Sequence, residues 1–289
     1  MPLHAPGPFE ERILVYGAQS SGKSSAWMAI ADLSLRTRSD AHFYVIDNDN
    51  ATARVIANPL GSYHHLTENT TVFVPKSIDD YKGITEQTLN DCTPDDFIVI
   101  DMLSNVWEGM PDWWHENVFG EDSWSYWTTT RKEIVQAEAS GGGHERQFGG
   151  TGGVDWQYIG KVYRAWEKQL SIGAPCHVFA TSSETEIQAR FDKTGEMTAQ
   201  YQIASNMAPK VEKGAPHRFH TIVRLNRIVS GQGARKSFTR KMTMVKDRDR
   251  ENIWADKGGR GLTIELGDPA KFGLDYLVAI AGWGLGKVE

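Results

Sequence analysis

An octapeptide near the amino terminus limits the possible folds of this chain more than any other feature. It reads Gly17-Ala18-Gln19-Ser20-Ser21-Gly22-Lys23-Ser24 and matches the spacing G-x-x-x-x-G-K-[ST]. The apolar run 12–16 precedes it, and residues 25–31 have the composition of a helix. A strand, a glycine loop and a helix in this order predict an α/β fold whose loop cradles phosphate groups.

The residue types of the loop explain its expected chemistry. Glycine at positions 17 and 22 lets backbone N–H groups turn toward a phosphate, and the helix N-terminus adds positive potential. Lys23 is expected to reach the β- and γ-phosphates, and the Ser24 hydroxyl is expected to bind Mg²⁺. We therefore predict ATP and Mg²⁺ as cofactors, with nucleotide contacts from the residues Gly17, Ala18, Gln19, Ser20, Ser21, Gly22, Lys23, Ser24 and Ser25.

Short apolar runs with polar ends recur along much of the chain. They lie at 12–16, 42–46, 71–75, 97–101 and 177–181. Their spacing leaves room for helical crossovers, which indicates a mostly parallel central sheet flanked by helices. Later in the chain, the runs 221–225 and 238–245 enclose a Gly-containing turn and predict an antiparallel C-terminal extension of the sheet.

Length and composition favour a single soluble domain. A chain of 289 residues that is 40% hydrophobic can bury one large core, and we expect one domain over 1–289 with its core at about 10–266 and a short helical tail at 267–289. Cys92 and Cys176 have no partner at metal-ligand spacing, so neither a disulfide framework nor a zinc site is predicted. No run of about 18 apolar residues occurs, so we expect a cytoplasmic protein with no membrane partner.

Asp101 is the candidate carboxylate for the metal. It ends the apolar run Phe97-Ile98-Val99-Ile100, and a carboxylate at such a strand end is suited to hold the Mg²⁺ of a bound nucleotide. The alternative is an ordinary turn residue. The residues 102–105 contain no glutamate, so the group that activates the attacking water must come from another strand.

The best candidate for that group lies at the end of the second strand. Together with the glycine loop and Asp101, the sequence Ile46-Asp47-Asn48-Asp49 resembles the RecA-type recombinase core, whose second strand ends in an acidic residue that orients the attacking water. Asp49 falls on this position, where the family commonly has the longer glutamate. Asp47 is the second candidate, and a plain Asx turn is the alternative. The resemblance implies a RecA-like P-loop ATPase that hydrolyses ATP.

The same resemblance assigns roles to two later strand ends. Ser182 and Ser183 stand where RecA-like proteins sense the γ-phosphate, although any hydroxyl-rich strand end has a similar sequence. Lys246 and Arg248 resemble the Lys-x-Arg element that reaches the γ-phosphate of a neighbouring subunit and stabilises phosphoryl transfer. A basic strand end in solvent is the alternative. The implied partner is a second copy of this chain, in a ring or filament with shared sites.

Charge is distributed unevenly along a chain whose net charge is −6. Residues 1–180 contain 13 basic and 24 acidic residues, whereas residues 181–260 contain 16 basic and 9 acidic ones. In RecA-like proteins the segment after the sensor strand contacts DNA, and here that segment is basic and carries aromatic residues suited to base stacking. The implied ligand is single-stranded DNA, and the alternative is a hairpin covered by solubilising charge. The candidate phosphate contacts are Arg190, Lys193, Lys210, Lys213 and Arg218.

Tryptophan is concentrated in one acidic span. The span contains Trp107, Trp113, Trp114, Trp124 and Trp127 together with five acidic residues. This negative charge repels a phosphate backbone, so we expect core packing or a subunit interface here rather than a platform for DNA bases.

The chain length leaves room for a RecA-like core and little else. In layout it is closest to the compact RecA-fold ATPases that phages encode for recombination and single-strand annealing, which would act in the host cytoplasm. We interpret the chain as a DNA-stimulated ATPase that oligomerises and binds single-stranded DNA. Two alternatives stay open: a hexameric helicase or DNA-packaging motor on the same core, and a nucleotide-dependent assembly switch with little turnover.

Overall fold

A computed structural model describes residues 10–36, 40–140, 153–187, 201, 204–230, 237–247 and 263–266 of the chain. Eight strands form its main sheet in the order β10-β9-β8-β1-β5-β4-β2-β3. Their bounds are β1 Arg12–Gly17, β2 Phe43–Asp47, β3 Thr70–Phe73, β4 Phe97–Asp101, β5 His177–Ser182, β8 Thr221–Ser230, β9 Ser237–Asp247 and β10 Thr263–Leu266.

Strand direction divides the sheet into two parts. The strands from β3 through β2, β4, β5 and β1 to β8 pair in parallel. At the other edge, β9 pairs antiparallel with β8, and β10 pairs antiparallel with β9. The prediction of an α/β fold, with a mostly parallel central sheet and an antiparallel C-terminal extension, is therefore confirmed.

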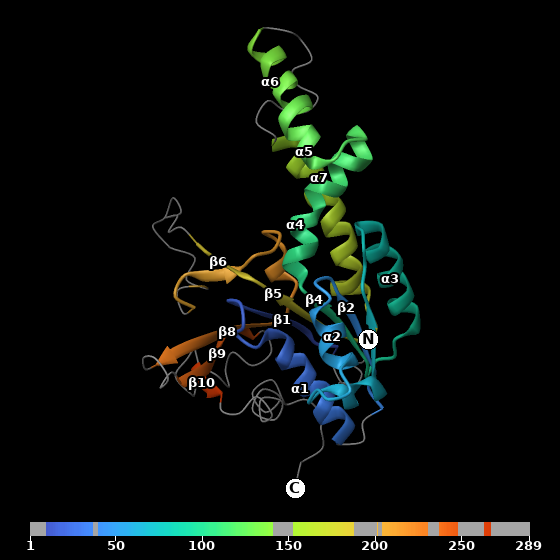
Figure 1. Ribbon diagram of the computed structural model, residues 1–289, viewed down its shortest axis with the longest axis vertical. Helices are drawn as coiled ribbons and strands as arrows, with labels where there is room; N and C mark the ends of the chain where they lie inside the picture. The colour runs from blue at the N-terminus through green and yellow to red at the C-terminus, as the bar shows by residue number, and fades with distance from the viewer. Residues whose placement is uncertain are drawn as a thin grey trace, which may run out of the picture.

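Helices cover both faces of the sheet because its strands are apolar on both sides. Val15, Val45 and Val99 contribute to a buried cluster with α1 (Lys23–Arg36), α2 (Ala51–Ala57) and the short helix η1 (His64–Glu68). The alternate strand positions, such as Leu14 and Ile98, contribute to a second cluster with α3 (Ile78–Asp91), α4 (Leu103–Trp114) and α7 (Gly153–Lys168). Figure 1 shows α1 on one side of the strands and α4 with α7 on the other.

A group of helices rises above the sheet in Figure 1. Between α4 and α7 it contains the π-helical turn η2 (His115–Phe119), α5 (Ser123–Ser125), the π-helical turn η3 (Tyr126–Thr130) and α6 (Arg131–Ala139), and the π-helical turn η4 (Gln169–Gly173) follows α7.

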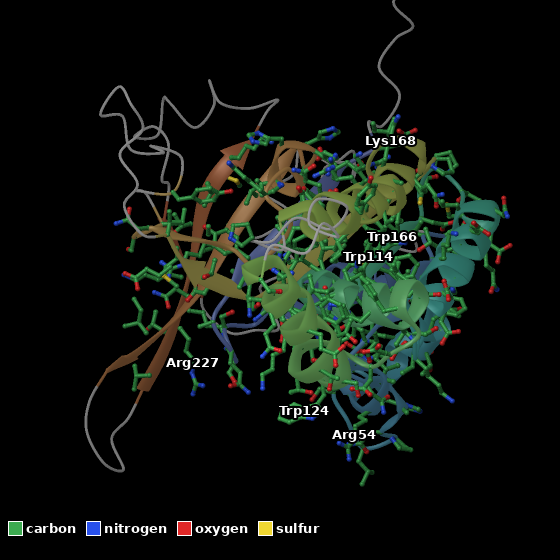
Figure 2. The ribbon with its side chains drawn as sticks, turned by 90° about the horizontal axis from the view of Figure 1, so that it is seen from above. Arg54, Trp114, Trp124, Trp166, Lys168 and Arg227 are labelled. Atoms are coloured by element: carbon green, nitrogen blue, oxygen red, sulfur yellow. The ribbon has the colours of Figure 1, made fainter. Side chains whose placement is uncertain are left out.

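The tryptophans of the acidic span divide between the interior and the surface of this group of helices. Trp107 meets Tyr163 edge-on with ring centroids 5.1 Å apart, whereas Trp124 is 78% exposed and Trp127 is 52% exposed. Figure 2 shows Trp124 at the edge of these helices.

A small antiparallel ribbon follows the fifth strand. Its strands are β6 (Glu184–Glu186) and β7 (Met207–Pro209), and the short helix η5 (Ala215–His217) comes before β8. The ribbon directly follows the predicted sensor residues, and β7 lies within the segment that was predicted to contact DNA. Of that segment, 188–200 and 202–203 lie outside the described residues.

The predicted helical tail at 267–289 lies outside the described residues, so the domain boundaries stay a prediction. Cys92 and Cys176 are both buried free thiols. In the described part of the chain, no helix combines the length and apolarity that crossing a membrane requires.

His177 is a buried titratable group at the start of β5. Its Nδ1 accepts a hydrogen bond of 3.0 Å from the backbone N–H of Glu11, and its ring stacks on Phe97 with centroids 4.7 Å apart. Burial, assisted by the positive charge of Arg12, lowers the pKa of His177 to about 4. The folded state therefore holds the imidazole neutral at a pH where the unfolded chain protonates it.

This pKa predicts a loss of stability in mild acid. A histidine whose pKa is lowered by folding contributes fully above its unfolded pKa of about 6.5, and the contribution is lost as the pH falls toward 4. Between pH 7 and pH 5, the free energy of unfolding should fall by about 2 kcal/mol more in the wild type than in His177→Phe, which does not titrate. Urea denaturation at each pH measures this difference. If the free energy of unfolding changes equally with pH in the two proteins, His177 does not have the lowered pKa.

Candidate nucleotide-binding site

The glycine loop joins β1 to α1 at the carboxyl edge of the parallel strands. Two of its residues, Ser20 and Gly22, have positive φ values of 61° and 101°. Gly17 ends β1 directly beside β8, and a Cβ atom at this position would lie 2.1 Å from the carbonyl oxygen of Leu225. The loop therefore depends on glycine for close strand packing at its start and for a left-handed turn near its end.

Lys23 begins α1 and is 8% exposed. Its ammonium donates hydrogen bonds of 3.0 Å to the carbonyl oxygens of Gly17 and Ala18. Burial lowers the pKa of Lys23, and the carboxylates around it, chiefly that of Asp101, oppose this shift. Ser24 follows in the first turn of the helix and is half-buried. The loop thus gathers a lysine, a hydroxyl and helix N–H groups within one turn.

Asp101 ends β4, which is separated from β1 only by β5, and it is 2% exposed. Three side chains donate hydrogen bonds to its carboxylate. Thr181 Oγ1 donates to Oδ1, while Thr52 Oγ1 at 3.1 Å and Trp27 Nε1 at 3.3 Å donate to Oδ2. These donors stabilise the buried negative charge and fix the direction of the carboxylate.

The acidic residues at the end of β2 differ in their surroundings. Asp47 pairs in register with Asp101, is fully buried and accepts a 2.9 Å hydrogen bond from the N–H of Ala53. Burial, and then the neighbouring Asp49 carboxylate, raises the pKa of Asp47 to about 6, against the N–H bond that lowers it. Asp49 is exposed, and its Oδ1 accepts a 2.9 Å hydrogen bond from the N–H of Ala51. This bond has the form of the Asx turn that was the alternative interpretation.

Asn48, which the sequence did not single out, links the ends of β2 and β4. Its Oδ1 accepts hydrogen bonds from the N–H of Met102 at 2.9 Å and from Nδ2 of Asn105 at 3.0 Å. Its Nδ2 donates to the Met102 carbonyl oxygen at 2.6 Å. The side chain therefore holds the backbone that directly follows Asp101.

The predicted sensor residues lie at the end of β5. Ser182 is fully buried, and its hydroxyl donates to the carbonyl oxygen of Ser183 at 2.8 Å. The N–H of Ser183 donates to the Ser104 hydroxyl of α4 at 3.3 Å. The sensor role of the two serines stays a prediction.

An ion pair that the sequence did not predict lies next to these serines. Glu184, the first residue of β6, accepts hydrogen bonds from Arg224 of β8 at 2.8 and 3.4 Å. Arg224 also donates to the Ala204 carbonyl oxygen at 3.0 Å, and Glu184 is among the carboxylates that raise the pKa of Lys23. Its partner comes from 40 residues away, so no local sequence signal points to the pair.

Lys246, predicted to act on a neighbouring subunit, is held by its own chain. Its ammonium donates to the carbonyl oxygens of Pro216, His217 and Phe219 at 3.0, 3.3 and 2.6 Å. A trans-acting role would require Lys246 to leave these three acceptors. Arg248 lies outside the described residues, and both assignments stay predictions.

Two of the predicted DNA contacts form ion pairs within the chain. Lys210 lies 2.6 Å from Glu108, and both side chains are about half exposed, which leaves the lysine open to exchange partners. Arg218 pairs with Glu167, whose side chain is 3% exposed. Burial raises the pKa of Glu167 to about 7, against the opposing charge of Arg218. Arg218 therefore compensates a buried carboxylate in this structure.

The remaining predicted DNA contacts are less constrained by the structure. Lys213 is exposed between β7 and η5. Arg190 and Lys193 lie outside the described residues. DNA contact by this group of residues stays a prediction.

The donor set at the loop fits Mg²⁺. In the described part of the chain, no cluster of three His, Cys, Asp or Glu side chains could hold a metal by itself. Mg²⁺ in nucleotide sites takes only one or two protein oxygens and completes its shell with water and phosphate. A hydroxyl at Ser24 and an oriented carboxylate at Asp101 are ligands of this kind.

A comparison of structures finds a similar protein, whereas comparisons of sequence find none. No family model matches the sequence, and no curated protein matches it. Among solved structures, the crystal structure of the RadB recombinase is similar at 11% sequence identity, with 88% of this chain and 84% of that chain covered and a TM-score of 0.45.

The packing of Gly17 generates a prediction about stability. In Gly17→Ala the new methyl group overlaps the Leu225 carbonyl, so β1 and β8 must separate, and the free energy of unfolding should fall by about 1–3 kcal/mol. Gly83→Ala is the matched control, because a Cβ there meets no atom within 4 Å and α3 gains about 0.5–1 kcal/mol from the better helix former. Urea denaturation of the three proteins measures both effects. Equal stability of Gly17→Ala and wild type would show that the two strands are not packed this closely.

Proposed function

We propose that the chain is a RecA-like ATPase that binds Mg²⁺ and ATP at the glycine loop. The observation that carries this proposal is the joint placement of a buried Lys23 and a buried, oriented Asp101 at one sheet edge. Parallel α/β sheets bind their ligands at the carboxyl ends of the strands, where both residues lie. The loop spacing supports a nucleotide rather than another anion.

In this proposal each residue of the loop has a separate task. The N–H groups from Gly17 to Ser25 bind the phosphate oxygens, and Lys23 exchanges its two carbonyl acceptors for β- and γ-phosphate oxygens. Ser24 and Asp101 hold Mg²⁺, which neutralises charge on the β- and γ-phosphates. Thr181, Thr52 and Trp27 keep the Asp101 carboxylate in a fixed orientation for this purpose.

Asp49 is the proposed residue that orients the attacking water. Its carboxylate is exposed to water and lies close enough to Lys23 to influence the pKa of the lysine. Asp47 is fully buried and accepts a hydrogen bond from the α2 backbone, so it is better suited to support the β2 end than to reach the substrate. We assign water activation to Asp49 and positioning to Asp47.

The proposed partners are single-stranded DNA and further copies of the chain, in recombination or strand annealing. The basic segment 181–260 and the exposed Lys213 support a polyanionic ligand near the β6–β7 ribbon. The ribbon starts at Glu184, directly after the predicted sensor residues. A movement of these residues on nucleotide binding would therefore act directly on the proposed DNA-binding segment. Oligomer contacts are proposed through Arg248 and, if it exchanges its carbonyl acceptors, Lys246.

Removal of the loop lysine tests the proposal. Lys23→Ala should weaken Mg-ATP binding about 100-fold or more, because a charged contact to two phosphates is lost. Lys82→Ala, at an exposed lysine of α3, is the matched control and should bind as the wild type does. Calorimetric titration measures affinity, and phosphate release with and without single-stranded DNA measures turnover. A wild type that binds no ATP, or a Lys23→Ala protein that binds it normally, would refute the proposed function.

The water-activating role predicts a split between binding and turnover. Asp49→Asn should lower kcat by about 100-fold or more while leaving ATP affinity close to that of the wild type. Asp47→Asn should keep most of the turnover, because the amide still accepts the Ala53 hydrogen bond. Steady-state phosphate release on the two variants compares them directly. A normal kcat in Asp49→Asn, with loss in Asp47→Asn, would transfer the role to Asp47.

A further inference from the structure

Two arginines face each other across the β8–β9 hairpin. Arg227 and Arg240 are direct register partners in an antiparallel pair, so their side chains emerge from the same face. Figure 2 shows Arg227 on this ribbon.

Strand alternation fixes which face the two arginines occupy. Leu225 and Met242, also register partners, belong to the buried cluster that packs against α1. Arg227 and Arg240 are two residues further toward the hairpin turn on each strand, so they extend that same face beyond the apolar cluster. The intervening Lys241 emerges from the opposite face.

Arg240 lies beside the glycine loop. A Cβ atom at Gly22 would lie 3.4 Å from both Cδ and Nε of Arg240, and that Nε atom is buried. Gly17, at the start of the loop, pairs with Leu225 of β8, so the hairpin and the loop are joined by the sheet. The base of the guanidinium group therefore lies next to the loop that carries Lys23.

We propose that Arg240, supported by Arg227, is a second cationic element that binds the polyphosphate of the nucleotide within the same chain. This inference rests on the proposed nucleotide site. A guanidinium group donates two parallel hydrogen bonds to phosphate oxygens, and its charge does not depend on pH in the physiological range. The arginines approach from the hairpin, whereas Lys23 and the N–H groups approach from the loop and α1.

A DNA phosphate is the competing ligand for an arginine pair in a basic segment. The position of Arg240 favours the nucleotide, because its side chain lies beside Gly22 of the glycine loop. The pair also differs from Lys246 and Arg248, which were predicted to serve a neighbouring subunit. It would act in a monomer.

Calorimetric titration of Mg-ATP, ADP and inorganic tripolyphosphate tests the inference. Arg240→Ala should weaken binding of all three about tenfold to a hundredfold, the range expected for lost hydrogen bonds to a charged group. Arg227→Ala should have a smaller effect in the same direction. Lys241→Ala is the matched control, because it removes the same charge from the next residue but on the opposite face, and its affinities should equal those of the wild type. Arg240→Gln, which keeps much of the side chain, decides the matter if Arg240→Ala does not fold.

Three outcomes distinguish a failure of the arginine site from a failure of the proposed nucleotide site. If Lys23→Ala abolishes binding while both Arg240 variants bind normally, the arginine site is refuted and the nucleotide site stands. If Arg240→Gln weakens binding of single-stranded DNA but not of tripolyphosphate, the ligand is DNA and the inference is wrong. If the wild type binds no nucleotide, both proposals fall.

Discussion

The buried carboxylate of Asp101 is the interaction on which the site depends. A carboxylate that is 2% exposed is stable only when hydrogen bonds compensate its lost hydration. Here the donors come from α1, α2 and β5, through Trp27, Thr52 and Thr181. One charge at the end of β4 thus fixes three other elements around the carboxyl edge of the sheet, and each must be in place for the charge to be tolerated.

The neighbouring strands extend this arrangement in both directions. Toward β2, Asn48 holds the backbone after Asp101 and places Asp47 in register beside it. Toward β8, the pair of Glu184 with Arg224 connects the end of β5 to the strand that packs against the loop. The loop, the Asp101 carboxylate and the hairpin are therefore parts of one hydrogen-bonded edge, which is the physical basis for proposing that they bind one ligand.

The sequence predicted the parts of this edge that local patterns determine. The strand–loop–helix order around Gly17 and Lys23, the strand ending at Asp101 and the antiparallel hairpin all follow from apolar runs and glycine spacing. Partnerships between distant residues were not predictable, because Thr52 and Trp27 are ordinary helix residues until the fold brings them to Asp101. The same limit applies to Lys246 and Arg218, whose charge suggested external phosphates and whose partners in the structure belong to the chain itself.

A crystal structure of the protein with Mg²⁺ and a non-hydrolysable ATP analogue would show whether the glycine loop and Asp101 bind the same nucleotide. We expect the β-phosphate within the turn from Gly17 to Ser24, with Mg²⁺ between the Ser24 hydroxyl and Asp101. A triphosphate bound elsewhere on the chain, or a metal shell in which Asp101 takes no part either directly or through water, would contradict this expectation.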